Sequence, residues 1–230
     1  MLELNKIYNM DCIDGMKLIE DNSIDLIVTD PPYLIDYQTN RRKRNNEKIS
    51  AKIIGDTDFE LIEKYIQDCN RIMKENTALY MFCSFDKIEL FKLELQKYFK
   101  IKNMIIWEKN NGTVGDLEAQ FQKKYEIMFL VNKGRKKFNG KRITDVWKFS
   151  KVTEKQRIHS NQKPIELINQ CIVKHSNENE VVFDGFMGSG TTAVSAYNLN
   201  RKFIGFELDK EYFDIASLRI KQEVDQIKLF

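Results

Sequence analysis

An abrupt strand ending constrains this chain more than any other feature. Residues Ile24 to Thr29 form an apolar stretch that predicts a buried β-strand, and Asp30-Pro31-Pro32-Tyr33 follows at once. Neither proline has an N–H group, so the hydrogen-bond ladder of the strand cannot continue through them. The ending leaves a carboxylate, unpaired backbone carbonyls and an aromatic ring at the carboxyl end of the strand. In an open α/β sheet, that edge is where ligands bind.

Strand-like and helix-like segments alternate along most of the chain. Apolar side chains at helical spacing mark the helices, and short apolar runs mark the strands. This alternation predicts the α/β class, with a mostly parallel sheet covered by helices on both faces. We expect strands at 6–9, 24–29, 78–83, 102–107, 125–131, 180–183 and 202–206, and helices at 12–19, 59–73, 86–98, 164–174, 190–199 and 210–226.

Two segments break this alternation, residues 34–56 and residues 133–163. The second carries eleven Lys and Arg side chains against two acids, and the first contains the run Arg41-Arg42-Lys43-Arg44. Neither resembles an independent domain, so we expect one domain over residues 1–230. Basic side chains beside a ligand-binding edge suit contacts with phosphates, whereas a solvated loop is the alternative for each segment.

The composition excludes several classes of protein. The net charge is only +3 over 230 residues, and no apolar run approaches the roughly 20 residues that span a bilayer. The first residues lack the pattern of a signal peptide. The four cysteines lie far apart without zinc or redox spacing, so we expect reduced thiols, no metal site and a cytoplasmic protein.

A second strand–turn–helix motif lies near the end of the chain. Residues 181–184 predict a strand, and Gly185-Phe186-Met187-Gly188-Ser189-Gly190-Thr191-Thr192 follows it. Glycines let the backbone approach a ligand closely, and the N–H groups of a helix N-terminus favour a negatively charged group such as a carboxylate. A Walker A loop requires lysine where Thr191 stands, so triphosphate binding is disfavoured.

An acid, Glu207, ends the next predicted strand about 20 residues after the glycine turn. In nucleotide-binding sheets an acid at this place accepts hydrogen bonds from ribose hydroxyls. The alternative is an N-cap for the final helix, a role that Asp209 could fill instead. Taken with the glycine turn, Glu207 favours an adenosine-containing ligand.

These motifs resemble those of the DNA amino-methyltransferases that use S-adenosylmethionine. The order, Asp-Pro-Pro-Tyr first and Phe-x-Gly-x-Gly last, is similar to the permuted β class of that family. The resemblance covers nearly the whole chain and implies a Rossmann-like methyltransferase sheet. The chain departs from the family pattern at Gly185, where proline is common, and at Ser160 and Asn161. Two further matching elements are Asp11-Cys12 and His159-Ser160-Asn161-Gln162-Lys163-Pro164.

The resemblance implies a role for each matching residue. Asp30 and the carbonyl of Pro31 would accept hydrogen bonds from the target amino group, and Tyr33 would stack on the base, with Pro32 completing the catalytic motif. Lys163 and His159 would approach the methionine carboxylate. The cofactor side as a whole would comprise Asp11, Cys12, Asp30, His159, Lys163, Asp184, Phe186, Gly188, Ser189, Gly190, Thr191, Thr192 and Glu207.

The implied reaction is methyl transfer to an aromatic amino nitrogen. The lone pair of that nitrogen is delocalised into the ring, and two acceptors on its hydrogens would favour a pyramidal, more nucleophilic nitrogen. The base must leave the duplex to be reached. Within the family, aspartate at position 30 points to adenine N6. Cytosine N4 is one alternative, and a catalytically silent DNA-binding relative is another.

The expected partner is double-stranded DNA, in the manner of restriction–modification enzymes. Relatives commonly dimerise, so a homodimer is a further expectation, whereas neither a membrane nor a metal is expected. The predicted DNA contacts come from the first irregular segment and are Tyr37, Arg41, Arg42, Lys43 and Arg44.

Overall fold

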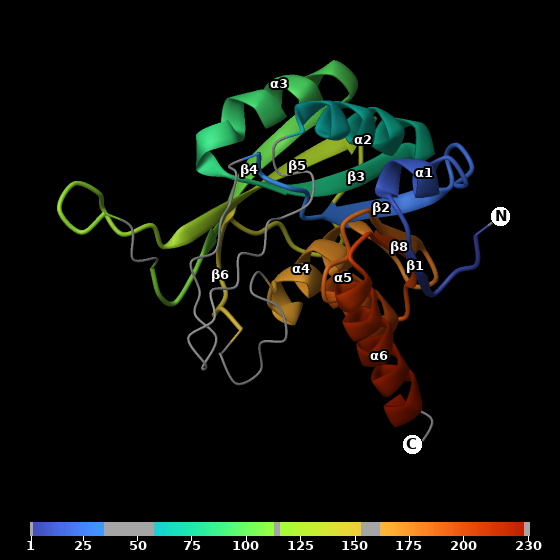
Figure 1. Ribbon diagram of the computed structural model, residues 1–230. Helices are drawn as coiled ribbons and strands as arrows, with labels where there is room; N and C mark the ends of the chain where they lie inside the picture. The colour runs from blue at the N-terminus through green and yellow to red at the C-terminus, as the bar shows by residue number, and fades with distance from the viewer. Residues whose placement is uncertain (1, 35–57, 113–115, 153–161, 228–230) are drawn as a thin grey trace.

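An eight-stranded sheet organises the protein in this computed structural model, which describes residues 2–34, 58–112, 116–152 and 162–227 (Figure 1). The strands are β1 (Lys6–Asn9), β2 (Ile24–Thr29), β3 (Met73–Cys83), β4 (Lys100–Glu108), β5 (Tyr125–Lys133), β6 (Val146–Lys148), β7 (Val181–Asp184) and β8 (Lys202–Glu207). Their order across the sheet is β1-β8-β7-β2-β3-β5-β4-β6. β5 pairs antiparallel with β3 and β4, and the other neighbours pair in parallel.

Helices cover both faces of the sheet (Figure 1). One face carries α1 (Cys12–Met16), α2 (Phe59–Ile72) and α3 (Ile88–Tyr98), which follows a short 3₁₀ turn, η1 (Phe85–Lys87). The other face carries α4 (Ile165–His175), α5 (Thr191–Asn198) and α6 (Lys210–Ile227). Each layer packs its apolar side chains on the sheet, which gives one core cluster per face.

Helix α2 shows why these segments form these elements. The Asp58 carboxylate accepts a hydrogen bond from the Leu61 amide and caps the first turn. One stripe of the helix is fully buried against the sheet: Ile62, Tyr65, Ile66, Cys69 and Ile72. The apolar stripe therefore fixes which face of α2 the sheet covers.

The α/β class, the mostly parallel sheet and the two helical layers are confirmed. All four cysteines are free and buried, as expected for reduced thiols. The element prediction is wrong in residues 146–148, where the second irregular segment contains β6. This strand is too short to show a period, and it is held by Trp147, which is buried against the sheet and donates its indole N–H to the Thr144 carbonyl. The prediction is also wrong in residues 73–77, which extend β3 directly from the end of α2.

The strand order brings separate motifs to one edge of the sheet. β1, β8, β7 and β2 are parallel neighbours, so their carboxyl ends lie together. Asp11 and Asp30 follow two of these strands, and Asp184 and Glu207 end the other two. Because β5 runs in the opposite direction, its first residues, including Glu126, lie at the same edge.

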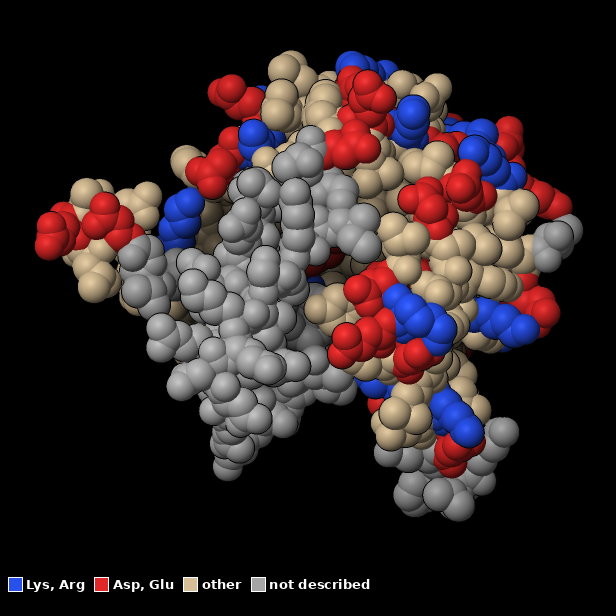
Figure 2. Space-filling view, in the orientation of Figure 1, with Lys and Arg blue, Asp and Glu red and all other residues tan. Residues whose placement is uncertain are grey.

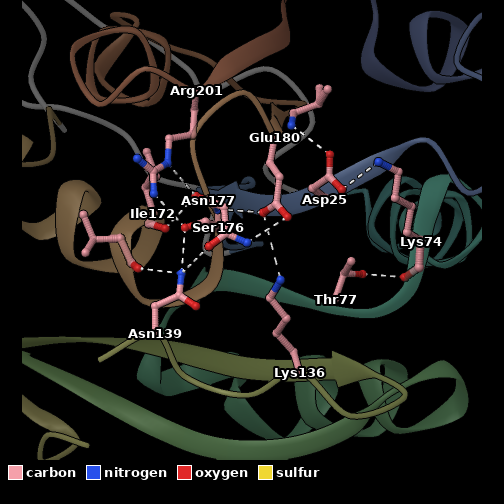
Figure 3. Close-up of polar contacts among 12 residues, drawn as sticks. Asp25, Lys74, Thr77, Lys136, Asn139, Ile172, Ser176, Asn177, Glu180 and Arg201 are labelled. Carbon is pink, nitrogen blue, oxygen red and sulfur yellow. Dashed lines mark hydrogen bonds and ion pairs between the residues drawn. The ribbon is translucent and has the colours of Figure 1, made fainter. Parts of the chain in front are cut away.

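The opposite edge is closed by a polar network (Figure 3). Asp25, near the start of β2, forms an ion pair with Lys74 at 2.7 Å. The Asn139 side chain donates to the Ser176 carbonyl at 2.8 Å, and Arg201 donates to the same oxygen at 2.7 Å. The contacts of Asn139 and Arg201 fasten the segment after β5 to the end of α4 and the start of β8. The polar side chains at this edge therefore stabilise the fold.

Candidate active site

Asp30 lies within a group of buried charges at the end of β2. Its Oδ2 forms an ion pair with Lys163 Nζ at 2.6 Å, and the Tyr33 hydroxyl donates to its Oδ1. The side chain of Asp30 keeps 26% of its surface exposed, whereas that of Lys163 keeps 9%. The cation therefore lies beneath the carboxylate, and the carboxylate retains surface for a ligand.

Glu126 and Lys109 extend this group, and sequence reasoning missed both. Glu126 Oε2 lies 3.0 Å from Lys163 Nζ, and its Oε1 contacts the buried ammonium of Lys109, just after β4. The four charges alternate in the order Asp30, Lys163, Glu126 and Lys109. We refer to these four residues as the charge chain. Its two positive charges balance its two negative ones.

Burial and ion pairing shift the pKa values within the charge chain. Burial raises the pKa of Asp30, and the neighbouring Lys163 opposes this shift. Burial also acts on Glu126, but Lys163 and Lys109 outweigh it and lower the pKa of Glu126 to about 2. Burial disfavours charged Lys163, yet the two carboxylates raise its pKa above the ordinary range. Asp30 is therefore the carboxylate of this group that takes up a proton most readily.

The glycine turn lies at the end of β7, next to β2. Asp184 closes it, with Oδ1 accepting from the Phe186 amide at 3.0 Å and Oδ2 from the Thr192 hydroxyl at 2.7 Å. Burial raises the pKa of Asp184 to about 7. Gly188 and Gly190 have φ values of 53° and 82°, which favour glycine. A Cβ atom at Gly188 would meet nothing within 4 Å, so this part of the turn faces open space.

Two side chains support the turn from neighbouring elements. Glu207 Oε2 accepts from the Gly188 amide at 2.7 Å, and Arg219 on α6 donates to the carbonyl of Ser189. Asp209 accepts from two backbone amides in the first turn of α6 and is its N-cap. The alternative N-cap role for Glu207 is therefore wrong. Arg219 is a further residue that sequence reasoning missed.

Tyr65 joins the catalytic motif to the glycine turn. Its hydroxyl donates to Thr29 Oγ1 at 2.9 Å and accepts from the Gly185 amide at 3.2 Å. The ring of Phe186 packs edge-on against it, with centroids 4.8 Å apart. Proline at position 185 could not donate this bond, so glycine here is tied to a tyrosine hydroxyl. The ends of β2 and β7 are thus held together by one buried side chain.

Asp11 and Cys12 lie at the end of β1, beside β8. Asp11 Oδ1 accepts from the amide of Ile13 at 2.8 Å and caps α1. Cys12, the first residue of α1, is buried. Their contact with a cofactor stays a prediction, but both follow β1, the strand that pairs with β8.

Several predicted contacts fall outside the described residues. They are His159 on the cofactor side and, on the DNA side, Tyr37, Arg41, Arg42, Lys43 and Arg44.

Lys133, at the start of the second basic segment, lies within the described residues and has a structural role. Its ammonium donates to the carbonyls of Asn70 and Met73 at 2.8 and 2.7 Å. Lys133 therefore fastens β5 to the end of α2.

Three further observations concern the surface charges, the possible metal ligands and the helices of the described residues. Acidic and basic side chains are interspersed on the described part of the face in Figure 2, without a continuous basic patch there. Within the described ranges, no group of three or more His, Cys, Asp or Glu side chains is arranged to hold a metal ion. In the same ranges, no helix has the length and apolar character needed to cross a membrane.

Residues 24–218 match a family model described as DNA methylase. The Type II methyltransferase M.HinfI of Haemophilus influenzae is 32% identical over 247 residues, which cover 95% of this chain and 69% of that protein. The Type II methyltransferase M.BglII of Bacillus subtilis is 31% identical, with 97% and 71% covered.

Solved structures show the same fold. A structure of the M1.HpyAVI–SAM complex has a TM-score of 0.72 at 28% identity, covering 94% of this chain and 98% of that one. The PvuII DNA methyltransferase, described as cytosine-N4-specific, has a TM-score of 0.76 at 16% identity, covering 96% and 90%; that likeness concerns the fold alone. From its matched sequence and its site geometry, the chain belongs to the N6/N4 DNA methylase family.

Proposed function

We propose that this DNA methyltransferase transfers the methyl group of S-adenosylmethionine to the N6 amino group of adenine in double-stranded DNA. One observation carries the proposal. The Asp30 motif and the glycine turn follow β2 and β7, which are adjacent parallel strands, and Tyr65 bonds to both ends. A base held at the motif and a methyl donor held at the turn would therefore lie side by side.

S-adenosylmethionine fits the residues present at this edge. The open space at Gly188 leaves room for a ligand against the backbone. Glu207 uses one hydrogen bond per carboxylate oxygen toward the backbone, so acceptor sites remain for ribose hydroxyls. The N-terminus of α5 offers amide donors for the methionine carboxylate, and the hydroxyl of Thr191 is a further donor at the same place. The structure of the related M1.HpyAVI in complex with SAM supports this assignment.

Asp30 would act on the target amine through hydrogen bonding. When bound, S-adenosylmethionine supplies an electrophilic methyl group. The Asp30 carboxylate and the Pro31 carbonyl would each accept from one N–H of the amine, which directs its lone pair out of conjugation. Fixed placement of the nitrogen then supplies much of the rate. Tyr33 would cover the face of the base after it leaves the duplex.

The surroundings of Asp30 also suit removal of the proton. As the amine gains a methyl group it gains positive charge, and one of its N–H protons must leave. Burial raises the pKa of Asp30, which makes this carboxylate a better proton acceptor than an exposed one. Lys163 keeps the carboxylate ionised beforehand by opposing that shift.

Cytosine N4 is the second candidate target. The PvuII enzyme shares the fold and is described as cytosine-N4-specific, so the fold accepts either base. Aspartate at position 30 favours adenine by resemblance to the family. The two are separated by digesting DNA from a methylation-free host that expresses the protein. N6-methyladenine among the nucleosides supports the proposal, and N4-methylcytosine replaces it.

The catalytic assignment is tested by three proteins under the same expression. Wild type should modify a short recognition sequence, which long-read sequencing of the host DNA reveals with the modified base. Asp30→Ala should leave the same DNA unmodified. Asp214→Ala is the matched control, since it removes an exposed carboxylate on α6 that pairs with the surface Lys210. Equal methylation by Asp30→Ala and wild type would end the assignment, and an unmodified genome with wild type would favour a silent relative.

A further inference from the structure

Two members of the charge chain have no part in the proposed reaction, Glu126 and Lys109. Neither forms an ion pair with Asp30, yet at the same edge of the sheet Lys109 is buried and Glu126 is largely buried. Moving a charged side chain out of water costs free energy unless it is paired, so their placement needs a reason. Ion pairs link Lys109 to Glu126 and Glu126 to Lys163. Lys163 in turn pairs with Asp30, the carboxylate that would accept a hydrogen bond from the target amine.

We propose that Glu126 is a positioning residue for methyl transfer, acting on Asp30 through the ammonium of Lys163. The inference rests on the proposed function of Asp30. Glu126 draws the shared ammonium toward itself, which leaves part of the acceptor capacity of Asp30 open to the amine. Lys109 balances the charge that Glu126 brings into the site.

The geometry around Lys163 supports this division. Its Nζ lies 2.6 Å from Asp30 and 3.0 Å from Glu126, so one ammonium is shared between two carboxylates. Aromatic rings occupy other sides, with Nζ 4.7 Å from the Phe82 centroid and 5.7 Å from that of Tyr33. An ammonium has three donors, and a lysine stem is flexible. Without Glu126, those donors would turn to Asp30 and compete with the substrate.

The ionisation of Asp30 follows from every group that faces it. Tyr33 lies on the same turn, Lys163 precedes α4, and Glu126 lies on β5. Two further groups interact with it, Cys83 at the end of β3 and Asp184 at the end of β7.

Two of these groups act on Asp30 in opposite directions. The charge of Glu126 raises the pKa of Asp30, and that of Lys163 lowers it. Removing the charge of Glu126 should therefore move the acid limb of the pH–rate profile to lower pH. Removing the charge of Lys163 should move it to higher pH.

The experiment measures kcat and KM on a DNA substrate carrying the recognition sequence, from pH 5 to 9. The variants are Glu126→Gln, Lys163→Met and the double variant. Glu108→Gln is the matched control, because Glu108 ends β4 at the same edge and its carboxylate pairs with Lys124 and Lys148, two lysines outside the charge chain. Wild-type activity in the same assay tests the proposed function separately.

We expect Glu126→Gln to lower kcat on the order of tenfold. The KM values for DNA and for S-adenosylmethionine should stay within about threefold of those of the wild type. The acid limb of this variant should move to lower pH, and that of Lys163→Met to higher pH. Because Glu126 acts through Lys163, adding Glu126→Gln to Lys163→Met should change kcat by less than about twofold. Glu108→Gln should match wild type.

Two results would overturn the inference while leaving the function intact. The first is an active Glu126→Gln enzyme whose pH profile superimposes on wild type. The second is a full multiplicative loss in the double variant. Should Glu126→Gln fail to fold, Lys109→Met decides instead. Removing Lys109 lets Glu126 pull harder on Lys163, so the acid limb should move to higher pH, and an unmoved limb rejects the role.

Discussion

Replacing Lys163 with methionine should destabilise the protein most at neutral pH. The change removes the ammonium that two carboxylates share, at a site where the lysine side chain is 9% exposed. Breaking a buried ion pair by removing one partner typically costs about 3–5 kcal/mol. Asp30 and Glu126 are each about one quarter exposed, so water relieves part of that penalty. We therefore expect a loss of roughly 2–3 kcal/mol at pH 7.5, at or below the lower end of that range.

The sign of the pH dependence follows from the pKa shifts. Burial already raises the pKa of Asp30, and removing Lys163 removes the charge that opposes this rise. A raised carboxylate pKa destabilises the fold above that pKa and ceases to do so as pH falls through it. Glu126 acts in the same sense, because Lys163 helps to lower its pKa to about 2. The gap in unfolding free energy between wild type and Lys163→Met should therefore narrow as pH falls toward 5.

Urea unfolding of both proteins at several pH values from 7.5 to 5 measures this gap. A loss of 2–3 kcal/mol corresponds to a fall in Tm of roughly 4–12 °C for a chain of this size. Lys210→Met is the control, because the exposed pair of Lys210 with Asp214 should contribute less than about 1 kcal/mol. A gap that stays constant or widens as pH falls would refute the reasoning.

Three other substitutions test the support of the two turns. Gly190→Ala should cost about 1–3 kcal/mol, because φ is 82° and the new Cβ would lie 2.9 Å from that of Ala216; thermal unfolding checks this. Tyr65→Phe should cost about 1–3 kcal/mol by leaving the Thr29 hydroxyl and a turn amide without their partner, and unchanged urea unfolding would contradict it. Arg219→Met should weaken cofactor binding severalfold by releasing the glycine turn, which calorimetric titration with S-adenosylmethionine measures.

The positions of the two main motifs were predictable because each leaves a local signature. Two consecutive prolines, Pro31 and Pro32, interrupt the hydrogen bonding of a strand, and the glycines after Asp184 mark a tight turn before a helix. Their meeting at one edge followed from the alternation of strands and helices, which implies a parallel sheet. That Asp30 and the glycine turn follow adjacent strands, β2 and β7, is a finding of the structure, because the sequence does not give the strand order.

Glu126 was missed because its place depends on the direction of a strand. An apolar run such as residues 127–131 looks the same in either direction, and only pairing with β3 and β4 makes β5 antiparallel. That reversal moves Glu126 from the far edge to the catalytic edge. Tyr65 lies within the predicted helix 59–73, but the partners of its hydroxyl are set by tertiary packing, because they lie 36 and 120 residues away in sequence.

The borders of the sheet bear on how two copies could associate. Within the described residues, the outermost strands are β1 with four residues and β6 with three. A border strand is the place where a second chain could add its own strand and continue the ladder. Edge strands this short offer few unpaired backbone N–H and C=O groups, so joining two sheets edge to edge is unfavourable. A homodimer of this protein would thus be built from helix surfaces or loops, and the same brevity protects the chain from fibrillar stacking.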